Sequence, residues 1–544
     1  MTGGLFYAFL LSLLIGTVLT PCLMVGATWI GLLDQPDHRK VHKEPTARVG
    51  GIAFAIGALV SMGYWAPHNA VVIGAIAGSL IIVCMGSLDD FVDLRVRYKF
   101  AGQILAAGVV AIYTDLSWQP FSMLLGLELP TWLAMALTMA VLVTMTNAMN
   151  LSDGLDGLAG GLAFLSFGLV AYLAYQVDDI VVLFLTLSVM GGLLGFLRFN
   201  TYPARVFMGD GGSQFLGFAL GSAALFLTQA ERSPLSPLLV LLFFGMPLLD
   251  LVAVATQRLL RRRSPFQPDQ EHLHHKLLRL GFSHHQVVLI IYSLQIGLVV
   301  LAYHCRWNSD LFLASLYLLM VAGVGSFYYA VASGRLPADL FGRVSARTLY
   351  WRTWLRGRPW LAQGSLYGLA AGMAGFFLLG VGLPSILPKE LLYVALGLGG
   401  LVWGGLWGNV HTILLSTRMG LYLGSTLVLY GVERALVGSS QGLHLMFQLF
   451  FGILTIGLLL AIHLDKDKRF TPNPMDYLLL FLALIMPMLL KVHVGLVDVG
   501  EMMAKLIVLF FACEVLLQAF ATKARRLGYL SGMVLLGLGA HVFW

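Results

Sequence analysis

Acidic residues cluster in the segment GSLDDFVDLRVRYKF (86–100), directly after an apolar run. Asp89, Asp90 and Asp93 place three carboxylates close together, and Lys99 follows at the start of the next apolar run. Carboxylates are expensive to bury, so at a membrane edge they indicate either a solvated helix end or a functional site. Magnesium usually binds one or two carboxylates together with substrate phosphates. The segment is therefore a candidate for divalent-metal or phosphate chemistry.

The segment NAMNLSDGLDGLAGG (147–161) carries a second set of polar side chains. Its Asn and Asp residues recur every three positions, interleaved with glycines: Asn147, Asn150, Asp153 and Asp156. Asn and Asp beside Gly are ordinary turn chemistry, but four such side chains exceed what a turn needs. Glycines also allow a ligand to approach the backbone closely.

A third segment, RFNTYPARVFMGDGGS (198–213), ends at the start of another apolar run. Asp210 lies between glycines there, which is typical either of a glycine-rich helix cap or of a phosphate-binding helix start. In the second case the carboxylate of Asp210 would hold a metal against the phosphate. Asn200 lies in the same segment, and Phe207 provides either interfacial packing or a flat face for a base.

Three histidines, His272, His274 and His275, occur in the basic segment 257–281. No cysteine and no H-x-x-x-H pair accompanies them, so a zinc site is disfavoured. Contacts with a phosphate, or polarisation of a leaving group, fit the other clusters better. Arg258 serves either to orient the chain in the membrane or to contact substrate.

The elements that must position these residues are transmembrane helices. Of the 544 residues, 58% are hydrophobic and 11% charged, with a mean hydropathy of +0.83. Apolar runs of roughly 17–25 residues, each able to cross a bilayer, number about 11 in residues 1–331 and six or seven after 363. We predict an all-α polytopic transmembrane protein. Its expected parts are a catalytic membrane domain (1–332), a basic cytoplasmic linker (333–363) and a C-terminal transmembrane domain (364–544).

Basic residues indicate which side of the membrane carries the polar clusters. Of 23 Lys and Arg residues up to position 360, all but Arg232 and Arg306 fall in alternate loops. The positive-inside rule makes those loops cytoplasmic and puts the N-terminus outside. The polar clusters lie on that same side, which favours chemistry at the cytoplasmic surface over a transport pathway through the membrane. The sequence has no basic stretch interleaved with aromatic residues, so nothing in it indicates nucleic-acid binding.

The motifs together resemble a known family. DDxxD followed by R-x-K-F, NxxNLxDGxDGLAGG, FMGDxGS, and HxHH after SPFxxD resemble, in order and spacing, the polyprenyl-phosphate N-acetylhexosamine-1-phosphate transferases. These are the WecA-like and TagO-like bacterial enzymes of the superfamily that includes MraY. The resemblance covers roughly residues 1–330.

The resemblance implies a reaction at the cytoplasmic face of the bacterial inner membrane. Undecaprenyl phosphate attacks the β-phosphorus of a UDP-N-acetylhexosamine and gives a lipid diphosphate sugar and UMP, with Mg²⁺, or alternatively Mn²⁺, as cofactor. Asp210 would be the main metal ligand with Asn150 or Asp153, and Asp89 would deprotonate or orient the lipid phosphate. The other implied site residues are Asp90 and Asp93 beside Asp89, and, as substrate contacts, Lys99, Asn147, Asp156, Asn200, Phe207, Arg258, His272, His274 and His275.

The resemblance leaves several alternatives open. MraY enzymes characteristically have Lys at the position of Asp93, which moves the expected donor from UDP-MurNAc-pentapeptide toward UDP-GlcNAc; other N-acetylhexosamines remain open. A transporter of lipid-linked or nucleotide sugars is the rival from another class. Residues 364–544 carry no catalytic cluster, so we expect them to serve in structure or docking, in a homodimer or with assembly partners.

Overall fold

The structure is a computed structural model. It describes all residues except 1, 31–32, 35–44, 120–128, 230–233, 263, 265–270, 335–357, 382–388, 437–438, 465–475, 477, 480–492, 495–496, 521–523 and 541–544. Residues 335–357 of the expected linker lie outside the described residues, and a helix already begins at Pro359, within its expected end.

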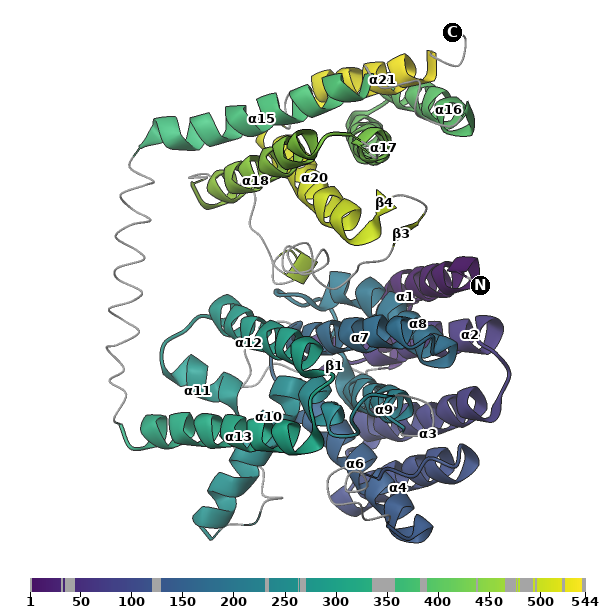
Figure 1. The fold of residues 1–544 in the computed structure, drawn as a ribbon, viewed down its shortest axis with the longest axis vertical. Helices are drawn as coiled ribbons and strands as arrows, with labels where there is room; N and C mark the ends of the chain where they lie inside the picture. Colours follow the sequence, from purple (N-terminus) through teal and green to yellow (C-terminus); the bar gives the residue numbers. More distant parts are fainter. Residues whose placement is uncertain are drawn as a thin grey trace. The chain divides into compact units, whose positions relative to one another are not determined.

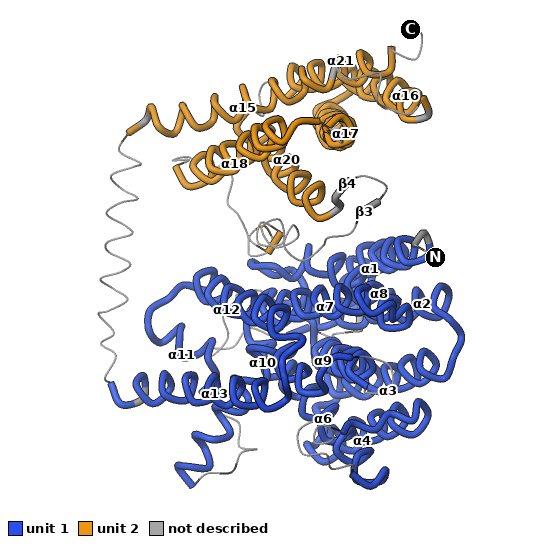
Figure 2. The backbone as a smooth tube through the Cα atoms, viewed as in Figure 1, with its two compact units in different colours: residues 1–342, 473–475 blue, residues 343–472, 476–544 orange. Residues whose placement is uncertain are grey.

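The described residues form two compact units, which confirm the prediction of an all-α membrane protein (Figures 1 and 2). The first unit runs from Met1 to Gly342, and the second comprises Arg343–Pro472 with Asp476–Trp544. Twelve of the described helices are long and apolar enough to cross a membrane. The chain is therefore a multi-pass membrane protein.

The first unit contains eleven long helices and one short one among the described residues. They are α1 (Thr2–Ile30), α2 (Gly50–Trp65), α3 (Ala70–Val92), α4 (Val96–Tyr113), α6 (Thr131–Ser152), α7 (Leu158–Gln176), α8 (Ile180–Asn200), α9 (Gly209–Leu227), α10 (Leu239–Leu260), the short α11 (Leu273–Arg279), α12 (His284–Cys305) and α13 (Asp310–Ala332). The short α11 carries two residues of the HxHH motif.

Helix α9 is the centre of this unit. It packs against α2, α3, α6, α7, α8 and α10, and every residue from Gly211 to Leu227 is buried. A helix that is apolar on all sides belongs in a protein interior rather than against lipid or water. Its first turn, which carries Asp210, therefore lies at the middle of one end of the bundle.

Three of the predicted site segments lie at turns that adjoin helices packed against α9. The chain turns between α3 and α4, between α6 and α7, and between α8 and α9, and each of these turns carries one motif. Contacts of α9 with α3, α6, α7 and α8 bring the three turns together. A small ladder of β1 (Leu33–Asp34) and β2 (Thr46–Ala47) lies beside them, because Ala47 also bridges to Val206.

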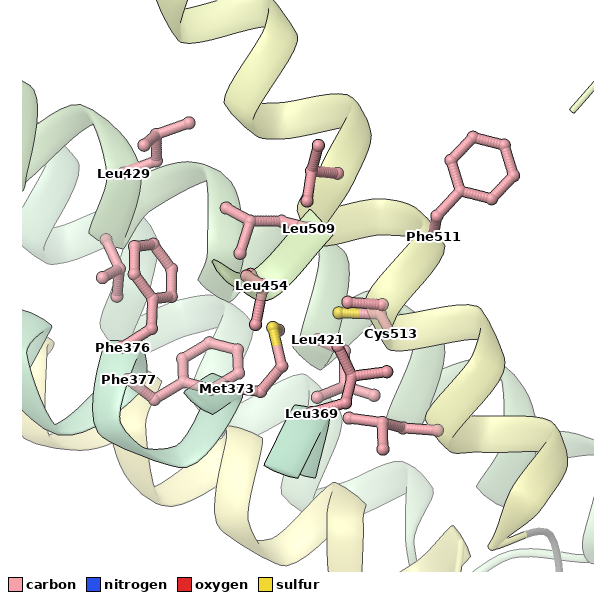
Figure 3. Packing of buried hydrophobic residues seen from close by; sticks show 14 of the residues in the cluster. Leu369, Met373, Phe376, Phe377, Leu421, Leu429, Leu454, Leu509, Phe511 and Cys513 are labelled. Atoms are coloured by element: carbon pink, nitrogen blue, oxygen red, sulfur yellow. The ribbon is translucent and has the colours of Figure 1, made fainter. Parts of the chain in front are cut away.

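The second unit contains α15 (Pro359–Val381), α16 (Lys389–Gly405), α17 (Val410–Leu436), α18 (Gln441–Leu464), α20 (Val499–Ala519) and α21 (Ala524–Ala540), with a ladder of β3 (His493–Val494) and β4 (Val497–Asp498). Figure 3 shows its packed interior, where Phe376 of α15, Leu454 of α18 and Leu509 of α20 belong to one buried cluster.

Ion pairs join two helices of the second unit. Arg418 of α17 lies 2.7 Å from Glu514 of α20, and Lys505 of α20 lies 2.6 Å from Glu433 of α17. Lys505 also pairs with Glu501 at 3.1 Å. Charged side chains within apolar helices are stable when they are paired in this way.

Candidate active site

Backbone hydrogen bonds to β2 and to the first turn of α2 hold the start of α9. The N–H of Phe207 donates to the carbonyl of Ala47 at 2.8 Å, and the N–H of Gly51 donates to the carbonyl of Met208 at 2.8 Å. Gly209 then takes a φ of 74°, a left-handed conformation that glycine adopts without steric cost. These contacts fix the position and direction of the first turn of α9.

Asp90 binds that first turn through both carboxylate oxygens. The N–H of Asp210 donates to Oδ1 at 3.0 Å, and the N–H of Gly211 donates to Oδ2 at 3.2 Å. N–H groups at a helix start have no partner within the helix, so an acidic acceptor there acts as a cap. The close approach of α3 requires Gly86, where a Cβ would lie 2.6 Å from the Cα of Gly211. Asp90 thus positions Asp210.

Lys99 lies between two carboxylates of the site. Its Nζ is 2.5 Å from Oδ2 of Asp89 and 3.6 Å from Oδ2 of Asp210. The N–H of Leu94 donates to the other oxygen of Asp89 at 2.8 Å. The ammonium group offsets the repulsion between two acids that come from different helices, so α3, α4 and α9 meet at one charged centre.

Asn150 and Asp153 complete this centre from the end of α6. The side-chain amide of Asn150 donates to Oδ1 of Asp210 at 3.2 Å and to Oγ of Ser213 at 2.8 Å. Burial, together with the nearby charges of Asp210, Asp90 and Asp156, raises the pKa of Asp153 to about 7. Residues of the first three motifs therefore meet at one charged centre.

The residues present fit a magnesium ion. Carboxylates of Asp210 and Asp153 and the amide oxygen of Asn150 are oxygen donors of the kind that Mg²⁺ prefers, and a cation would relieve the repulsion that raises the pKa of Asp153. Within the described residues, no three His, Cys, Asp or Glu side chains form a metal site by themselves. A site that draws its remaining ligands from water and substrate phosphates is the usual arrangement for Mg²⁺.

Asp156 and Asn200 connect the second and third motifs. The N–H of Ala204 donates to Oδ2 of Asp156 at 3.0 Å. Asn200 is buried; it accepts the N–H of Gly157 at 3.1 Å and donates to the carbonyl of Val206 at 2.9 Å. Both side chains therefore shape the loops that border the site, and their contact with substrate stays a prediction. Phe207 is half-buried in the same loop.

Asn147 belongs to a network of side-chain amides on α4, α6 and α9. It donates to Oε1 of Gln103 at 2.7 Å, and Gln103 donates to Oε1 of Gln214 at 3.1 Å. Gln103 and Gln214 are buried, so this network joins α4, α6 and α9. The substrate contact expected of Asn147 stays a prediction.

The histidines of the HxHH motif have three different environments. Nδ1 of His272 donates to Oδ2 of Asp250 at 2.9 Å. His274 is buried against Gly154, where a Cβ would lie 2.2 Å from Nε2 of His274. Burial lowers the pKa of His274 to about 3, so this ring is neutral. His275 is half-buried, and its ring centroid lies 4.2 Å from that of His274.

Two other expected site residues lie at helix ends. Asp93 is exposed and ends α3 in a left-handed conformation with a φ of 50°. Arg258 is buried in the last turn of α10. Contacts of either residue with substrate stay predictions.

The sequence alone did not reveal the roles of several residues that build the site. Gly86 and Ser213 lie within the motif segments, but glycine and serine are common in membrane helices and their types indicate no contact. Asp250 has a signal of its own outside the motifs, as an acidic residue inside an apolar run. Tyr328, which donates to Oδ1 of Asp250 from α13, had none.

The sequence of the chain is similar to those of several known proteins. The family model described as glycosyl transferase family 4 matches residues 72–228. A probable undecaprenyl-phosphate N-acetylglucosaminyl 1-phosphate transferase of Bacillus subtilis is 34% identical over 326 residues, covering 58% of this chain and 91% of the relative. A decaprenyl-phosphate N-acetylglucosaminephosphotransferase of Mycobacterium leprae is 35% identical over 296 residues (48% and 74%). An undecaprenyl-phosphate alpha-N-acetylglucosaminyl 1-phosphate transferase of Escherichia coli K12 is 30% identical over 275 residues (48% and 73%).

Proposed function

Since the chain belongs to glycosyl transferase family 4, we propose that it transfers N-acetylglucosamine 1-phosphate from UDP-GlcNAc to undecaprenyl phosphate. The observation that carries the proposal is the charged centre of Asp89, Lys99 and Asp210 at one end of the bundle. The names of the relatives support N-acetylglucosamine over UDP-MurNAc-pentapeptide as the donor. The products are a lipid diphosphate sugar, which initiates a cell-surface polysaccharide, and UMP.

In the reaction, an oxygen of the lipid phosphate forms a bond to the β-phosphorus of UDP-GlcNAc, and the bond from that phosphorus to the bridging oxygen breaks. UMP leaves with the bridging oxygen. Phosphoryl transfer needs positioning and charge neutralisation more than covalent help from the protein. Asp89 orients the lipid phosphate or accepts its proton, and Lys99 places a positive charge beside both Asp89 and the reacting phosphates.

Asp210, Asp153 and Asn150 hold Mg²⁺ in this proposal. A bound Mg²⁺ supplies charge neutralisation at the diphosphate and at the leaving oxygen. Asp90 holds the first turn of α9 so that Asp210 faces this position. Asp156, Asn200 and Phe207 border the place where we expect the uridine end.

We place the site at the cytoplasmic face of a bacterial inner membrane. The basic residues of the alternate loops support this orientation. It also suits the substrates, because the acceptor is anchored in the bilayer and the nucleotide sugar is soluble.

The test is transfer from radiolabelled UDP-GlcNAc to undecaprenyl phosphate by the purified full chain, with and without Mg²⁺. Asp210→Ala should abolish lipid product. Asp178→Asn is the matched control and should keep full activity, because Asp178 is exposed in the turn between α7 and α8 and Asn tolerates its positive φ. Product from another UDP-N-acetylhexosamine alone would change the donor. No lipid product with any donor would refute the transferase and favour the transporter.

A further inference from the structure

A buried carboxylate outside the recognised motifs anchors the histidine motif. Asp250 lies in the second half of α10, after a break at Gly245, where φ is 47° and ψ is −120°. The side chain of Gln295 stabilises the break, because its Oε1 accepts the N–H of Met246 at 2.9 Å and its Nε2 donates to Ser166 at 2.9 Å. Side-chain contacts from α12 therefore hold the break in place, and the break sets the direction of the half of α10 that carries Asp250.

The two oxygens of Asp250 have separate partners. Oδ1 accepts the backbone N–H of Leu273 at 3.0 Å and the hydroxyl of Tyr328 from α13. Oδ2 accepts Nδ1 of His272 at 2.9 Å. The first oxygen therefore fixes the start of α11 to α10 and α13, whereas the second acts only on the imidazole ring. A role limited to holding the backbone would need the first oxygen alone.

A carboxylate at Nδ1 determines what the other ring nitrogen can do. With Nδ1–H donated to Asp250, the carboxylate fixes the orientation of the ring, and Nε2 of His272 is the nitrogen left for a substrate group. Among the described residues no hydrogen bond occupies Nε2 of His272.

The motif also lies beside the charged centre. The rings of His272 and His274 are stacked 6.1 Å apart, and His274 packs on Gly154, the neighbour of Asp153 in the chain. Lys276, one turn further along α11, lies 4.0 Å from the ring centroid of Tyr328. Asp250 of α10 and Tyr328 of α13 thus both contact α11, through Leu273 and Lys276 respectively.

We propose that Asp250, held by Tyr328, is a positioning residue for the transfer reaction: it fixes the ring of His272 so that Nε2 is directed at the diphosphate of the nucleotide sugar. This inference rests on the proposed function. It assigns a role in the reaction to Asp250 of α10 and Tyr328 of α13, and neither residue belongs to a recognised motif.

A double-mutant cycle tests the proposal with the purified full chain in the UDP-GlcNAc transfer assay. Asp250→Asn keeps the size and one acceptor but removes the charge, and we expect kcat/KM to fall about 10- to 100-fold, as for other partners that orient a functional histidine. In the background of His272→Ala the same substitution should cost less than about twofold, because no ring is left to position.

Asp310→Asn is the control for a structural role. Asp310 is also a buried carboxylate of the first unit and accepts from Ser236, away from the motif. The fold loss of kcat/KM that Asp310→Asn causes should be the same in the wild-type chain and in the His272→Ala background. Tyr328→Phe, which removes only a hydroxyl, gives a second and milder cycle if Asp250→Asn does not fold.

The outcomes separate the two proposals. Wild-type activity in Asp250→Asn, or an equal loss with and without His272, would overturn the positioning role while leaving the transferase intact. If Asp250→Asn yields no folded protein, the Tyr328→Phe cycle decides by the same criterion. Absence of lipid product from the wild-type chain would overturn the proposed function and this inference with it.

Discussion

Asp90→Asn separates positioning from chemistry in the DDxxD segment. The carboxylate of Asp90 accepts two N–H groups of α9 at 3.0 and 3.2 Å. An amide can accept one of them, but its NH₂ group then faces the other donor. Loss of one hydrogen bond to a charged group costs about 1.5–3 kcal/mol. If that cost appears as misplacement of Asp210, kcat falls about 10- to 100-fold, since each 1.4 kcal/mol is about tenfold in rate.

The assay is UDP-GlcNAc transfer measured across a Mg²⁺ titration. We expect Asp90→Asn to raise the Mg²⁺ concentration needed for half-maximal activity, because the ligand Asp210 is no longer held, whereas Asp210→Ala stays inactive at any Mg²⁺ concentration. Asp178→Asn is the matched control, since Asp178 is exposed outside the motifs and Asn tolerates its φ of 57°; we expect activity within about twofold of wild type. Complete inactivity of Asp90→Asn at saturating Mg²⁺, or full activity, would refute the reasoning.

Three further substitutions test other contacts. Gly86→Ala places a methyl group 2.6 Å from the Cα of Gly211, so α3 and α9 must separate; transfer activity and the thermal unfolding temperature should both fall, and an unchanged Tm would contradict the close packing. Lys505→Ala leaves Glu433, whose side chain is only 10% exposed, without its cation and should lower the unfolding free energy by about 3 kcal/mol, as measured by thermal unfolding in detergent. Because burial lowers the pKa of His274 from 6.5 to about 3, the unfolded chain takes up a proton that the folded chain does not. Stability should therefore fall by roughly 1 kcal/mol per pH unit as pH drops below 6.5, and His274→Gln should lack this part of the pH dependence.

The fold class was predictable from the sequence, whereas the side that carries the site stays a prediction. Long apolar runs require helices, because a bilayer offers no partner for free backbone groups. The polar segments between those runs alternate along the chain, so a count of helices is enough to place them on one side. The order of the motifs then indicated the family, and the comparisons agree.

The roles of individual side chains depended on contacts that no local pattern encodes. Asp89 and Asp90 are neighbours in the sequence, yet one pairs with Lys99 and the other accepts the N–H of Asp210 in the first turn of α9, 120 positions later. Asp250 and Tyr328 meet across 78 positions. Periodicity and hydropathy report which face of a helix is apolar, but the angle and depth at which helices pack decide which polar atoms meet. The motifs therefore indicated which types of residue form the candidate site, and the packing of the helices around α9 decided which of their atoms meet.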